Sequence, residues 1–109
     1  MDKEMCDKIF AFAVKAIEDA GVHVVMESYK CSENGFEVVI NEGENQAIVS
    51  VTGDPATEEP KQKGVFTLKI SGAKAPEVFG YTPDGLVIFA GVLKKKMSDW
   101  REKVLKKSA

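Results

Sequence analysis

Apolar residues recur every three or four positions over residues 2–20, which predicts an amphipathic helix. Gly21 follows the last periodic position, where helices commonly end. Cys6 falls at the edge of the same apolar arc, so we expect its thiol to be buried as a structural group. The repeating apolar positions are Met5, Ile9, Phe12, Ala13, Ala16, Ile17 and Ala20.

The middle of the chain alternates with a period of two, which predicts strands over residues 22–30, 36–41 and 46–52. Short polar stretches, SENG and EGEN, separate the three segments and predict tight connections in an antiparallel meander. Because a slip of one residue would expose a whole apolar row, we expect a fixed register. The predicted inward rows are Phe36, Val38 and Ile40 on one strand, and Ala47, Val49 and Val51 on the next.

Residues 53–64 carry two prolines and no apolar periodicity, so we expect an exposed loop there. A clean alternation then predicts a strand over residues 65–71, and a short strand follows at residues 77–81. The tetrapeptide TPDG has Pro second and Gly fourth, which is typical of a β-turn. The apolar run LVIFAGV, residues 86–92, predicts a sixth strand covered on both faces.

Near the C-terminus, Leu93, Met97, Trp100 and Val104 are spaced four, three and four apart and would form one stripe on a helix. The stripe predicts a second amphipathic helix, with its lysines facing solvent. Three lysines at residues 94–96 would oppose the dipole of a helix that begins at Leu93. The start is therefore open between Leu93 and a cap at Ser98.

Together these elements predict one α+β domain over residues 1–109. Its antiparallel sheet would have five or six strands, with an N-terminal and a C-terminal amphipathic helix packed on it. In element order and in small acidic size the chain is similar to type III secretion chaperones. This similarity is one of architecture, rests on no matched residues and implies no functional site.

Charge divides the chain into two parts, although the net charge is only −2. Residues 1–60 hold 4 lysines against 13 acidic residues, a net −9, and residues 61–109 hold 11 basic against 4 acidic residues, a net +7. Such a division predicts either internal charge complementarity or an oriented surface field. No apolar run reaches the roughly 18 residues that a membrane span needs, and the acidic N-terminus is unlike a secretory signal. We therefore expect a cytoplasmic protein without a membrane span.

The sequence offers little recognisable chemistry, so an enzyme is the less expected outcome. His23 is the only histidine, and on a regular strand it would share a face with Glu27 and Tyr29. Neighbours two to four residues apart along a strand lie roughly 7–14 Å apart, too far for a direct hydrogen bond. We expect an outer-face histidine, no zinc site and no cofactor, because one histidine and two dispersed cysteines cannot complete a zinc site. Cys6 and Cys31 are expected to be two reduced structural thiols.

The leading functional hypothesis is a non-enzymatic domain that binds a protein partner and self-associates. Several apolar strand positions would fall on the face that the helices do not cover, and exposed apolar patches often mark interfaces. The basic helix would contribute a second surface. The expected partner surface comprises Val25, Val39, Ile48, Val65, Lys94, Lys95 and Lys106.

Two alternatives remain. One is a small-molecule carrier or minor enzyme with a pocket between the sheet and the helices, lined by Phe12, Phe66, Phe89 and Trp100. The other is weak binding of an anionic surface or nucleic acid through the lysines of residues 94–107. The acidic first half would repel anionic polymers, so nucleic acid is the less expected partner.

Overall fold

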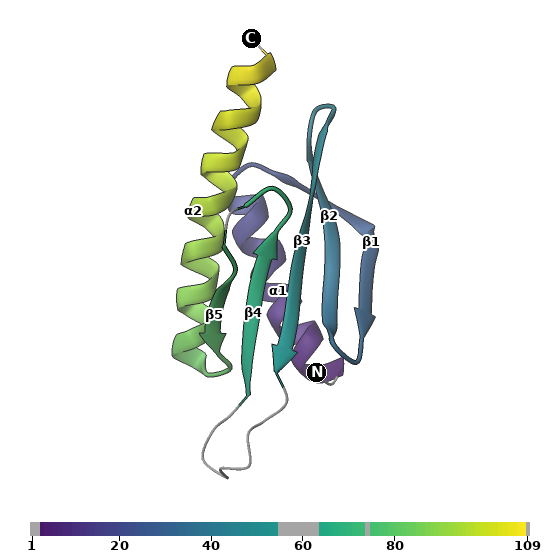
Figure 1. Cartoon of the computed structure of the whole chain (residues 1–109), viewed down its shortest axis with the longest axis vertical. Coiled ribbons are helices and arrows are strands. Elements are labelled where there is room, and N and C mark those ends of the chain that lie inside the picture. Colours follow the sequence, from purple (N-terminus) through teal and green to yellow (C-terminus); the bar gives the residue numbers. More distant parts are fainter. Residues whose placement is uncertain (1–2, 55–63, 74, 109) are drawn as a thin grey trace.

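The computed structural model describes residues 3–54, 64–73 and 75–108. Five strands form one antiparallel sheet in the order β1-β2-β3-β4-β5, with a helix before and after it (Figure 1). The predicted α+β architecture is confirmed, with five strands. The elements are α1 (Lys3–Asp19), β1 (His23–Ser32), β2 (Gly35–Glu42), β3 (Asn45–Asp54), β4 (Val65–Ile70), β5 (Glu77–Gly80) and α2 (Pro83–Ser108).

The two helices lie side by side and run in the same direction along the sheet (Figure 1). They bury one face of it. The inward rows predicted on β2 and β3 are buried, and so are the alternating residues Phe66, Leu68 and Ile70 of β4. The register confirms the predicted meander, since Val38 pairs with Val49 and Phe36 with Val51. These side chains meet Ile9, Ala13 and Ile17 of α1 in one core, as the helical and strand periods require.

Tight turns join the first three strands. Ser32 pairs with Gly35 and Glu42 with Asn45, so two residues connect each pair of strands. Gly35 has a φ of +147°, and a Cβ there would overlap the carbonyl oxygen of Val51. Only glycine fits this close approach of β2 to β3. The predicted loop at residues 53–64 falls mostly on residues 55–63, which lie outside the described residues.

The prediction of a sixth strand at residues 86–92 is wrong, because these residues form the first turns of α2. Thr82 caps the helix: its hydroxyl oxygen accepts a hydrogen bond from the Gly85 N–H at 2.9 Å, and its carbonyl accepts one from Leu86 at 2.9 Å. Pro83 then occupies the first helical position, where a missing N–H costs nothing. The TPDG sequence therefore begins α2, and the prediction of a β-turn there is wrong.

The longer helix also corrects both predicted starting points, at Leu93 and at Ser98. Residues 94–96 lie in the middle of α2, so their lysines do not oppose the dipole at its N-terminus. The predicted apolar stripe is buried at Leu93, Met97 and Val104, and Trp100 packs half-buried against the core. Helical periodicity extends the stripe back through Leu86 and Phe89.

A bulge interrupts β1 between Val25 and Lys30. Ser28 spans it, because its hydroxyl accepts a hydrogen bond from the Val39 N–H at 2.7 Å and donates one to the Val25 carbonyl. The bulge turns Tyr29 toward α1, where its ring stacks on Phe10 with centroids 4.0 Å apart. The predicted row of His23, Glu27 and Tyr29 on one face is therefore wrong.

Neither helix, within the part of the chain that the structure describes, is long and apolar enough to cross a membrane.

Candidate functional site

The face of the sheet that points away from the helices carries a short apolar row. Val39 pairs with Val25 on one side and with Ile48 on the other, so the three side chains lie on adjacent strands in one line. Val25 and Val39 are half-buried, and Ile48 is 42 % exposed. Among the described residues, no helix covers this row. We call this side of the sheet the open face.

Val65 lies on the same open face but at the far end of β4. Val65 is the first residue of β4 and pairs with Asp54 and Gly80. Ile48 lies at the opposite end of β4, because its N–H donates to the hydroxyl of Ser71, the residue after the strand. The four predicted apolar positions thus share one face, and three of them form the contiguous row.

A polar row crosses the open face beside the apolar one. Lys30 pairs with Glu37, Glu37 with Ser50, and Ser50 with Lys69, so the row runs from β1 to β4. The strand spacing of about 4.8 Å places the Glu37 and Lys69 backbones roughly 10 Å apart, with Ser50 between them. The row therefore places Glu37 and Lys69 on opposite sides of β3, with Lys30 beyond Glu37 on the edge strand.

The basic part of the predicted partner surface lies elsewhere. Lys94, Lys95 and Lys106 are exposed on α2, in the layer on the other side of the sheet. The predicted surface thus divides into an apolar part on the open face and a basic part on α2, and the fold does not join them.

Among the described residues, two ion pairs connect α2 to the sheet. Lys96 Nζ lies 3.4 Å from Glu77 Oε1, and Arg101 Nε lies 3.3 Å from Glu42 Oε2. The buried Nε of Arg101 makes this contact as an ion pair without hydrogen-bond geometry. The Arg101 pair joins the acidic first half of the chain to the basic second half, so part of the charge division is internal complementarity.

The four residues predicted to line a pocket lie in different surroundings. Phe66 and Phe89 are fully buried and pack edge-to-face with centroids 5.0 Å apart, and Phe79 lies against both at 5.7 and 5.5 Å. These rings fill the core. Phe12 is half-buried on α1, where it packs against the core.

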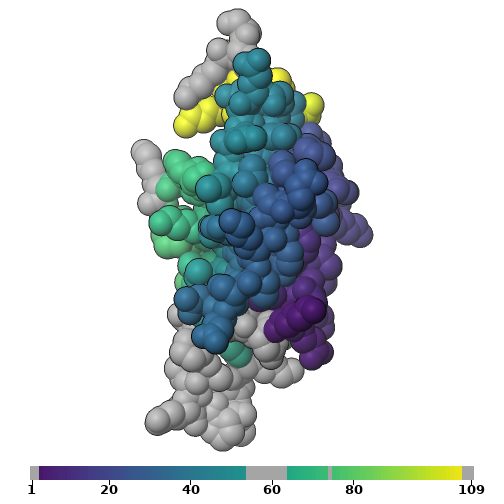
Figure 2. Space-filling model, turned by 90° about the vertical axis from the view of Figure 1, so that its right-hand side faces the viewer, coloured from purple at the N-terminus to yellow at the C-terminus, as the bar shows by residue number. Residues whose placement is uncertain are grey.

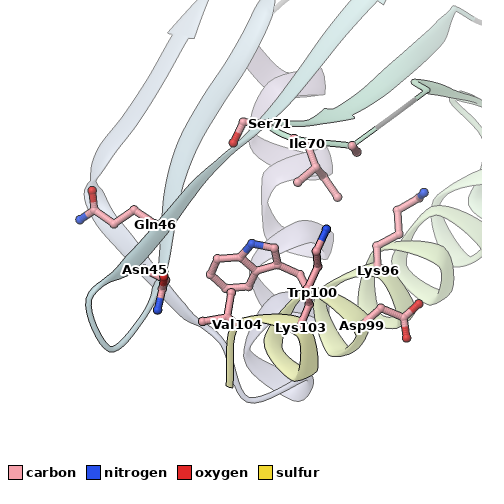
Figure 3. A pocket seen from close by; sticks show the side chains of 11 residues that line it. Asn45, Gln46, Ile70, Ser71, Lys96, Asp99, Trp100, Lys103 and Val104 are labelled. Atoms are coloured by element: carbon pink, nitrogen blue, oxygen red, sulfur yellow. The ribbon is translucent and has the colours of Figure 1, made fainter. Parts of the chain in front are cut away.

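Trp100 does line a hollow, of about 460 Å³, between α2 and the loops at one end of the sheet (Figure 3). The indole lies between the hairpin residue Asn45 and the side chain of Ile70. Lys96, Lys103 and Asp99 line the edge of the hollow, two cations against one carboxylate, and Gln46 and Ser71 add polar groups. Sequence patterns could not reveal it, because its walls come from loops that only the folded meander brings to α2.

The histidine and the two cysteines are not among the residues that line this hollow. His23 is exposed at the start of β1, as the outer-face prediction states. Cys6 is buried and Cys31 exposed, and both thiols are free. No three His, Cys, Asp or Glu side chains converge into a metal site among the described residues.

Comparisons of the chain with protein-family models, with curated proteins and with solved structures found no match.

Proposed function

We propose that the protein is a protein-binding domain that self-associates through its open face, with a second copy as the occupant. The observation that carries the proposal is the uncovered row of Val25, Val39 and Ile48, which crosses three adjacent strands. Burial of exposed apolar area drives association. Two sheets pack face to face at about 10 Å, with inner side chains interdigitated.

Charge complementarity favours a copy of the same chain. A two-fold axis that runs along β3, between two facing sheets, would place β2 of each copy opposite β4 of the other. Glu37 of one copy would then face Lys69 of the second copy, and the contact would occur twice. Ile48 on β3 would lie close to the axis, against its own counterpart. The interface is therefore self-complementary in both charge and hydrophobicity.

Light scattering after size exclusion, over a range of concentrations, tests the proposal. We expect the wild-type protein to dimerise, and Ile48→Lys to shift the equilibrium at least about tenfold toward monomer, because the lysine would lie close to its symmetry mate. The control is Lys94→Glu, an exposed change on α2 that should leave the dimer intact. A strictly monomeric wild-type protein at high micromolar concentration would remove the proposal.

A second candidate function rests on the hollow beside Trp100. An indole wall with Lys96 and Lys103 at its edge would suit a small anionic ligand with an apolar or aromatic body. Binding at 100 times the dissociation constant should stabilise the fold by about 2.7 kcal/mol. A metabolite screen by thermal shift, repeated with Trp100→Ala, would detect such a ligand.

The binding of anionic polymers by the lysines of α2 remains a prediction. The salt dependence of binding would test it.

A further inference from the structure

The end of β1 places Cys31 on the helix-covered side of the sheet. Cys31 pairs with Phe36, and residues paired across antiparallel strands point to the same face. Phe36 is buried beneath α1, where its ring meets that of Phe10 edge-on with centroids 5.6 Å apart. The thiol of Cys31 is thus directed toward the first turns of α1.

Cys6 lies on α1 one turn before Phe10, and its side chain is fully buried. Tyr29, two residues before Cys31, stacks on Phe10, and its hydroxyl donates to Asp7 at 3.4 Å. The ring contacts and this hydrogen bond therefore hold the end of β1 against the turn that carries Cys6. In Figure 1 the arrowhead of β1 ends near the start of α1, and Figure 2 shows the two elements meeting along this side of the molecule.

The two cysteines are neighbours at this contact between β1 and α1. The Cys31 side chain is a near enough neighbour to act on the ionisation of Cys6. Burial, followed by the neighbouring Cys31 side chain, raises the pKa of Cys6 to about 12. Cys6 is therefore held as a thiol at neutral pH, while Cys31 is the member of the pair that solvent reaches.

We propose that Cys6 and Cys31 form a redox-active pair, which closes to an intramolecular disulfide on reaction with a small-molecule disulfide such as oxidised glutathione. The exposed Cys31 thiolate attacks one sulfur of oxidised glutathione. A mixed disulfide forms on Cys31, and the other half of the oxidant leaves as the first glutathione thiolate. Cys6 then attacks the Cys31 sulfur, and its proton passes to the second glutathione thiolate as that thiolate leaves. In total, two protein thiols become one disulfide, and the oxidant is reduced to two thiols.

This pairing goes beyond the two separate structural thiols that the sequence predicts. The two cysteines lie near the start of α1 and the end of β1, and only the β1–β2 register together with the β1 bulge brings them near each other. The disulfide would tie the last residues of the edge strand β1 to the first turn of α1. The site is independent of the open face, because it lies on the other side of the sheet.

Reduced protein incubated with oxidised glutathione tests the proposal, with intact mass, peptide mapping and thiol counting as the measurements. We expect both thiols to disappear together in a monomeric product that retains no glutathione and yields a Cys6–Cys31 linked peptide. A product with glutathione on Cys31 and a free Cys6, or a Cys31-linked pair of chains, would overturn the proposal.

Two variants separate the roles. Cys6→Ala should retain one glutathione on Cys31, because no second thiol is present to displace it. Cys31→Ser changes an exposed residue, so the fold should persist, and its buried Cys6 should not react until denaturant is added. A native Cys31→Ser protein that reacts at Cys6 as fast as the wild type reacts would contradict the assigned order of attack.

Discussion

The two faces of the one sheet differ sharply. On the covered face, the central positions of β2, β3 and β4 are apolar and almost fully buried, from Val38 through Val49 to Leu68. On the open face, apolar side chains alternate with charged and hydroxyl side chains, and Ile48 keeps 42 % of its surface exposed. The same strands thus provide both faces, because successive side chains point to opposite sides.

This difference separates stability from recognition. Burial of the covered face removes apolar area from water and supplies most of the favourable free energy of folding. The open face contributes less to the fold, so its side chains can vary without unfolding the protein. Substitutions on the two faces should accordingly affect different measurements.

The largest expected effect is on the covered side, at the ring cluster between β4, β5 and α2. Phe89→Ala should lower the free energy of unfolding by about 3–5 kcal/mol, because it leaves a cavity against Phe66 and Phe79. Urea denaturation measures the change. The control is Val87→Ala on the same helix, which should cost less than about 0.5 kcal/mol, since Val87 is 64 % exposed.

A neighbouring pair on β3 compares the faces directly. Val49→Ala removes two fully buried methyl groups. It should lower the free energy of unfolding by about 2 kcal/mol, because buried apolar area is lost and a cavity is left. Ile48→Ala, one residue away on the open face, should cost under about 1 kcal/mol when measured on the monomer. Equal losses at the two positions would show that something covers the open face within the same chain.

A smaller effect is expected where α2 begins. Thr82→Ala removes the hydroxyl that accepts the Gly85 N–H, and a lost N-cap typically costs about 1 kcal/mol. Thr82→Ser keeps the cap and should restore most of the loss. Thermal unfolding of the three proteins side by side checks this, and an unchanged Thr82→Ala would place the start of the helix elsewhere.

The smallest effect should come from the ion pair between α2 and β5. Lys96 and Glu77 keep 31 % and 43 % of their side-chain surfaces exposed, so solvent screens their attraction. A double-mutant cycle with Lys96→Ala and Glu77→Ala should give a coupling energy of about 0.5 kcal/mol or less. A coupling well above 1 kcal/mol would mean that the pair is shielded from water.

Sequence periodicity predicts α1, the meander and the inward rows because each has one face in the core and one outside. It fails at residues 86–92, where Val87 and Ile88 are exposed on a helix although they are apolar and β-branched. The run therefore shows neither the helical nor the strand period. Thr82 as a cap, followed by Pro83, was the signal for a helix start in the sequence. The same four residues, TPDG, also fit a β-turn, so the sequence did not distinguish the two structures.

Of the candidate sites, the sequence predicts only the one that follows from the alternation of apolar and polar residues along the strands. The apolar positions of the open face come directly from the strand period, once the opposite face is assigned to the core. Two other features depend on the tertiary structure. The approach of Cys31 to the α1 turn that carries Cys6 needs the bulge in β1, and the hollow beside Trp100 needs loops from two hairpins.

Sedimentation equilibrium of a charge-exchange series tests most directly whether the open face joins two copies of the chain. Glu37→Lys and Lys69→Glu should each weaken the dimer, because like charges would then face each other at both symmetric contacts. The double variant should recover most of the wild-type affinity, since it only exchanges the partners. If the two single changes leave the dimer intact, or if the double variant is as weak as the singles added together, the open face is not the interface.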